Sequence, residues 1–83
     1  DAVIIKPALS YLDIISKVKD RFSIPIIGYC VSGVYSMVKS ASRENLIDEI
    51  DVTMEILFSI KRAGATAIIT YNAIEIAKKL NKE

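Results

Sequence analysis

The stretch AVIIKP at residues 2–7 is the first indication of the fold. Its four apolar residues include two β-branched types and predict a short strand that is covered on both faces. Pro7 has no backbone N–H with which to continue regular pairing. We therefore expect Lys6 to lie where the first strand ends.

Two more strand-like runs follow, PIIGYCVSG at residues 25–33 and TAIITY at residues 66–71. The segments between and after these runs carry apolar residues at intervals of three and four, which is typical of amphipathic helices. The predicted order is β-α-β-α-α-β-α. Buried strands that alternate with helices predict an α/β fold with a parallel sheet and right-handed crossovers.

Capping signals predict the helix ends. Each predicted start carries a short polar side chain that can accept a hydrogen bond from the first turn, and the long third helix stops at a glycine. The first helix is predicted to start at a cap formed by Ser10 with Asp13 and to end near Arg21. The third is predicted to start at Asp48 and to stop at Gly64, and the last to start at a cap formed by Asn72 with Glu75.

Three parallel strands leave two unpaired edges and need cover on both faces. We therefore predict that residues 1–83 form a single partial domain, cut from a larger sheet. The simplest parent is a (β/α)₈ barrel of about 250 residues, in which functional groups gather at the C-terminal ends of the strands. The start at Asp1 instead of methionine fits a fragment.

Composition excludes several classes of protein. Eleven basic and ten acidic residues leave a formal charge of +1, so nucleic acid is not expected as a partner. No apolar run is long enough for a membrane helix, and the N-terminus is unlike a signal peptide. A single cysteine, Cys30, excludes an internal disulfide. We expect a cytoplasmic protein, with the plastid as an alternative location.

The absence of histidine excludes serine-histidine and cysteine-histidine nucleophile pairs, and the sequence contains no metal-site pattern. Lys6 is the first candidate for chemistry. A lysine among apolar neighbours at a strand end can be partly neutral, and a neutral amine can form a Schiff base with a ketone. The alternative is that Lys6 lays its methylenes on the sheet edge and keeps its ammonium in water.

Three hydroxyl side chains are further candidates. Ser32 begins a predicted helix, where the free N–H groups favour a carboxylate; the alternative is an ordinary N-cap. Tyr71 ends the third predicted strand and could donate to the same carboxylate, or be a partly exposed ring. Tyr29 could form the wall of a small pocket, with core packing as the alternative, whereas Cys30 is interpreted as a small buried apolar residue.

Three segments in order resemble one family: VIIKPALSYLDII at residues 3–15, GYCVSGVYSMVK at residues 28–39 and KRAGATAIITY at residues 61–71. They are similar to the C-terminal part of the 5-aminolevulinate dehydratase (porphobilinogen synthase) family. The first resembles the family's VKP motif followed by YLDI, the second its Y-x-V-S-G motif, and the third its RAGA segment and closing TY. The resemblance covers nearly the whole chain.

This resemblance implies a (β/α)₈ barrel that joins two 5-aminolevulinate molecules into porphobilinogen during heme biosynthesis. By motif, Lys6 matches a Schiff-base lysine, Ser32 and Tyr71 match groups that bind the substrate carboxylate, and Tyr29 matches a tyrosine of the same pocket. The parent is expected to use zinc or magnesium and to form a homo-octamer. No cofactor is expected on this segment, and the segment alone is expected to be inactive without the remainder of the barrel.

Two positions depart from the family pattern. Val34 stands where the family usually has a glutamate after V-S-G, and Asn72 stands where an aromatic or aliphatic residue is common. Two other interpretations stay open at this point: a non-catalytic α/β module that associates with itself, and part of a class I aldolase barrel that also uses a Schiff-base lysine.

Overall fold

Three short parallel strands form the sheet in this computed structural model, which describes residues 1–82. They are β1 (Val3–Ile5), β2 (Ile26–Tyr29) and β3 (Ala67–Ile69), and they lie in the order β1-β2-β3. Both neighbouring pairs are parallel, with Gly28 opposite Ile5 on one side and opposite Ile68 on the other. The predicted α/β fold with a parallel sheet is confirmed.

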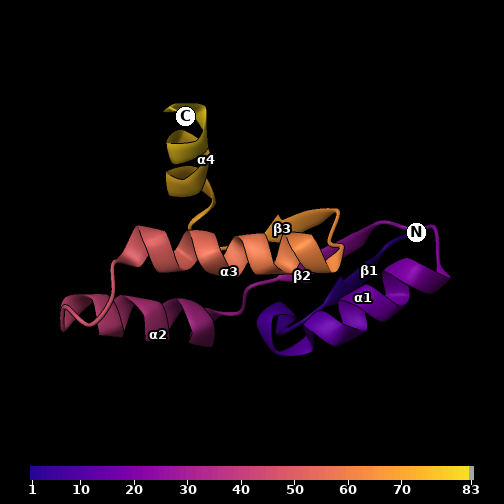
Figure 1. The fold of residues 1–83 in the computed structure, drawn as a ribbon, viewed down its shortest axis with the longest axis horizontal. Coiled ribbons are helices and arrows are strands. Elements are labelled where there is room, and N and C mark those ends of the chain that lie inside the picture. Colours follow the sequence, from indigo (N-terminus) through magenta and orange to yellow (C-terminus); the bar gives the residue numbers. More distant parts are fainter. Residues whose placement is uncertain (83) are drawn as a thin grey trace.

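Helices connect the strands as the sequence predicts, with one short 3₁₀ helix added after β1 (Figure 1). None of the helices found in residues 1–82 is long and apolar enough to cross a membrane. The helices are η1 (Ala8–Tyr11), α1 (Leu12–Arg21), α2 (Ser32–Arg43), α3 (Glu49–Ala63) and α4 (Ala73–Lys82).

The predicted limits of the long helix α3 are confirmed. The Asp48 carboxylate accepts a hydrogen bond of 2.9 Å from the backbone N–H of Asp51, and thereby satisfies a first-turn donor. At the other end Gly64 has a φ of 128°, a conformation that side chains with a Cβ rarely adopt. Its N–H donates to the carbonyls of the last turn, which ends the helix.

The predicted N-cap at Ser10 is wrong. Ser10 lies inside η1, and its N–H donates to the Pro7 carbonyl at 3.3 Å. An N-cap residue needs an extended backbone, whereas Ser10 is already part of a helical turn. The helix α1 therefore begins later, at Leu12, after Tyr11 and without a side-chain cap. Its end at Arg21 agrees with the prediction.

The core lies on the face of the sheet that α1 and α3 cover. Ile15 from α1 and Ile60 from α3 are fully buried there against Ile5 and Ile26. Gly28 allows the close approach of β2 and α3, because a Cβ at this position would lie 2.7 Å from Ile60 Cγ2. Apolar contacts on this one face hold the three strands to their helices.

The opposite face of the sheet is only partly covered. The register places Ile4, Ile27 and Ala67 in one row across the strands, and Ile4 is 54% exposed. The helix α4 projects away from the other elements (Figure 1) and does not cover this face. The exposed apolar row is what an incomplete barrel sheet would present toward the barrel interior.

Candidate functional site

The carboxyl ends of the three strands bring Lys6, Tyr29 and Tyr71 together. Lys6 directly follows β1, Tyr29 is the last residue of β2, and Tyr71 lies in the turn after β3. The Lys6 ammonium nitrogen lies 5.9 Å from the centre of the Tyr29 ring, within the range of a cation–π contact. Parallel strands produce this grouping because their C-terminal ends share one edge.

The prediction that Tyr71 ends the third strand is wrong, because β3 stops at Ile69. The Ile69 carbonyl accepts from the N–H of Cys30 at 2.8 Å. After it, the Thr70 hydroxyl accepts from the N–H of Asn72 at 3.3 Å and turns the chain into α4. Tyr71 sits at this turn with 56% of its surface exposed.

Tyr71 raises the pKa of Tyr29 above its ordinary value: hydrogen bonding to the Tyr71 phenol has the largest effect, and the charge that Tyr71 would carry acts in the same direction. The two tyrosines, with Ile69 and Thr70, line an open hollow of about 250 Å³. A phenol at this edge can donate a hydrogen bond to an anion.

The Lys6 side chain is exposed to solvent. The three strands alone do not supply the apolar enclosure that the Schiff-base interpretation requires. Further walls would have to come from beyond this sheet.

Ser32 is the first residue of α2 and is exposed. The N-cap is Val31, with an extended backbone and no side-chain cap bond, so the interpretation of Ser32 as an ordinary N-cap is wrong. Its hydroxyl lies at a helix start, where N–H groups favour an anion. Within residues 1–82, Ser32 makes no hydrogen bond to Lys6, Tyr29 or Tyr71.

Tyr35 was not singled out from the sequence, although it belongs to this group. Its ring stacks on that of Tyr71, with centroids 5.2 Å apart and planes 29° from parallel. The Lys39 ammonium lies 5.6 Å from the centre of the Tyr35 ring. The spacing of four residues between Tyr35 and Lys39 was the available signal, because it puts both on one helix face.

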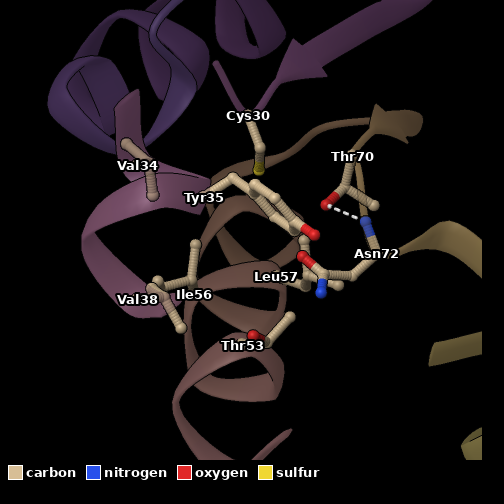
Figure 2. Close-up of a pocket in the computed structure, with 9 residues that line it drawn as sticks. All are labelled: Cys30, Val34, Tyr35, Val38, Thr53, Ile56, Leu57, Thr70 and Asn72. Atoms are coloured by element: carbon tan, nitrogen blue, oxygen red, sulfur yellow. Dashed lines mark hydrogen bonds between the residues drawn. The ribbon is translucent and has the colours of Figure 1, made fainter. Parts of the chain in front are cut away.

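A small, partly open cavity of about 20 Å³ lies between α2, α3 and the turn after β3, with the Tyr35 ring and the Asn72 side chain pointing toward it (Figure 2). This volume holds about one water molecule and no substrate. Cys30 is buried at its edge, as predicted, and burial raises the pKa of its thiol against the opposing effect of a hydrogen bond with Thr70.

The described residues contain no group of three histidine, cysteine, aspartate or glutamate side chains that could hold a metal ion. The chemistry available at this edge of the sheet is therefore that of an amine, phenols and a hydroxyl beside a helix start. Such groups suit a substrate that has both a carbonyl and a carboxylate.

Comparison with known proteins agrees with this chemistry. A family model described as delta-aminolevulinic acid dehydratase matches residues 1–79. The delta-aminolevulinic acid dehydratase of Halalkalibacterium halodurans is 53% identical over 83 residues, which is all of this chain and 25% of the relative. That of Bacillus subtilis is 52% identical over 80 residues, 96% of this chain and 25% of the relative. The chain thus spans about a quarter of the length of these curated relatives.

A solved structure has the same fold. The delta-aminolevulinic acid dehydratase of Toxoplasma gondii ME49, in complex with the reaction product porphobilinogen, superimposes with a TM-score of 0.91 and 44% identity. The match covers 94% of this chain and 22% of that one. It confirms the predicted fold class, βα units of a (β/α)₈ barrel, and decides against an aldolase barrel. The position of the segment at the C-terminal end of that barrel stays a prediction.

Proposed function

Since this chain belongs to the delta-aminolevulinic acid dehydratase family, we propose that it carries a Schiff-base lysine of an enzyme that condenses two 5-aminolevulinate molecules to porphobilinogen. The observation that carries this proposal is the position of Lys6. Its amine lies against Tyr29, at the edge where Tyr71 also stands. The same edge borders the exposed sheet face that would point into a closed barrel.

Lys6 is the proposed catalytic residue. Its neutral amine attacks the ketone carbon of 5-aminolevulinate, and the carbinolamine then loses water to form an imine. The protonated imine withdraws electrons from the neighbouring carbons, which favours the bond that joins the two substrate molecules. The Tyr29 ring beside Lys6 restrains the lysine side chain, so less of its freedom is lost when substrate binds; the ammonium gives up its proton before the attack.

Ser32 and Tyr71 are the proposed carboxylate ligands. The Ser32 hydroxyl stands at the start of α2, where the helix dipole and the unpaired N–H groups favour negative charge. The Tyr71 phenol is exposed at the same end of the sheet and can donate a hydrogen bond. Tyr29 is the proposed neighbour that orients the Tyr71 hydroxyl by hydrogen bonding. A fixed carboxylate would orient the ketone toward the lysine.

The rest of the barrel is the proposed partner of this segment. The partly covered sheet face and the exposed Lys6 side chain support this, as does the chain's share of about a quarter of the relatives' length. We expect the segment alone to be inactive, and the longer protein to be cytoplasmic and octameric. The longer protein is also proposed to hold zinc or magnesium, and no step at Lys6 is assigned to that metal.

Borohydride trapping on the full-length protein tests the proposal. The protein is incubated with 5-aminolevulinate, or with levulinate as an inert analogue, then reduced and mapped by mass spectrometry. We expect a reduced adduct on Lys6, and its loss in Lys6→Met. Lys61→Met, an exposed lysine at the end of α3, is the matched control and should keep the adduct. An active protein without an adduct on Lys6 would overturn the assignment.

A further inference from the structure

We propose that Tyr35 is a positioning residue for this site, whose ring sets the orientation of Tyr71; this inference rests on the proposed function. Tyr71 lies outside β3, in a turn, and is 56% exposed. Backbone pairing therefore does not fix its ring. The stack with Tyr35, at a centroid distance of 5.2 Å, is the described contact that restrains the ring plane.

Tyr35 is itself held from two sides. Its ring is partly buried and borders the small cavity that also contacts Cys30 and Thr70. One helical turn further on, the Lys39 ammonium lies over the ring. That ammonium forms a 2.8 Å ion pair with Glu49, the first residue of α3. The helix pair α2 and α3 thus provides a rigid support for a residue in a turn.

The stack with Tyr35 sets the plane of the Tyr71 ring. The stack uses only the ring of Tyr35 and not its hydroxyl. Phenylalanine at position 35 should therefore preserve the site, whereas an aliphatic residue should not.

Steady-state kinetics of the full-length protein with 5-aminolevulinate test this role. An aromatic pair is worth about 0.5–1.5 kcal/mol, which corresponds to a rise in KM of about 2- to 10-fold for Tyr35→Leu. We expect kcat to change much less, because the lost interaction orients a carboxylate ligand in ground state and transition state alike. Tyr35→Phe should restore KM. Phe58→Leu, an exposed ring on α3, is the matched control.

A double-mutant cycle with Tyr71→Ala decides whether Tyr35 acts through Tyr71. In the Tyr71→Ala background, Tyr35→Leu should raise KM no further. If Tyr35→Leu raises KM equally in the wild-type and Tyr71→Ala backgrounds, the positioning role is overturned. It is also overturned if Tyr35→Phe raises KM as much as Tyr35→Leu does. If Tyr35→Leu does not fold, Tyr35→Met removes the ring with less loss of volume. A wild-type protein that does not convert 5-aminolevulinate would instead overturn the proposed function.

Discussion

The Lys6 ammonium lies 5.9 Å from the centre of the Tyr29 ring, although Lys6 follows β1 and Tyr29 is the last residue of β2. The cause is the parallel register, in which Ile5 is opposite Gly28. The residues that come next, Lys6 and Tyr29, then stand side by side. A slip of one residue would move one of them to the other face of the sheet, so backbone pairing sets this contact.

Loss of the Ser32 hydroxyl should weaken substrate binding in the full-length protein. A hydrogen bond to a charged group is worth about 1.5–3 kcal/mol, so we expect Ser32→Ala to raise KM for 5-aminolevulinate about 10- to 100-fold. Ser36→Ala, one turn further along α2 and also exposed, is the control. Equal KM values for both variants in steady-state assays would remove Ser32 from the carboxylate site.

Gly28→Ala should destabilise the fold by about 1–3 kcal/mol, because overpacking forces β2 away from α3. The new Cβ would lie 2.7 Å from Ile60 Cγ2. Gly33→Ala is the matched control, since a Cβ there meets nothing within 4 Å and its site is helical. It should be neutral or stabilising by up to about 1 kcal/mol. Urea unfolding of the full-length variants measures both, and an unchanged midpoint for Gly28→Ala would contradict the packing.

Cys30 should react slowly with thiol reagents while the protein is folded. Burial raises the pKa of the thiol, and only the thiolate reacts. Mass spectrometry after alkylation, with and without urea, should find Cys30 modified mainly in the unfolded protein. Rapid alkylation of Cys30 in the native state would contradict the burial of this residue.

The same raised pKa makes a stability prediction with a definite sign. The folded state holds the thiol proton more tightly than the unfolded state does. The stability that Cys30 contributes in this way is therefore fully present below the unfolded pKa of about 8.5. It decreases as the pH rises from there through the folded pKa. Unfolding midpoints across this range should fall less steeply for Cys30→Ala than for the wild type. Identical slopes would show that Cys30 does not contribute.

The isolated 83-residue chain should associate with itself, because apolar side chains such as Ile4 and Ile69 are exposed at the sheet. Gel filtration should show oligomers or aggregates, and Ile4→Lys should reduce them. Phe22→Lys, an exposed position outside the sheet, serves as the control. A compact, stable monomer of the unmodified chain would contradict this prediction.

The pKa of Tyr29 should lie above that of an ordinary tyrosine, since hydrogen bonding to the Tyr71 phenol favours its protonated form. NMR signals of tyrosine ring carbons in the full-length protein, assigned with Tyr→Phe variants, measure its pKa directly. We expect Tyr71→Phe to lower the pKa of Tyr29 toward its ordinary value. An unchanged pKa in that variant would mean that the hydrogen bond does not form in solution.

Local patterns determined much of this protein. The apolar run before Lys6, the Asp48 cap and the Gly64 stop depend on residues close in sequence, and the structure confirms the elements that they predicted. The motifs also identified the family that the comparisons then matched. The prediction failed at Ser10, where the turn after Pro7 takes the backbone into a 3₁₀ helix before a cap can form.

How the site residues meet depends on contacts between elements that are far apart in sequence. The stack of Tyr35 on Tyr71 joins a helix to a distant turn, and the contact of Lys6 with Tyr29 depends on strand register. Neither contact has a local signature, because each is set by how whole elements pack and pair. Residues close in sequence predict which elements form and where Lys6 lies, whereas the packing and pairing of those elements place Tyr29 beside it.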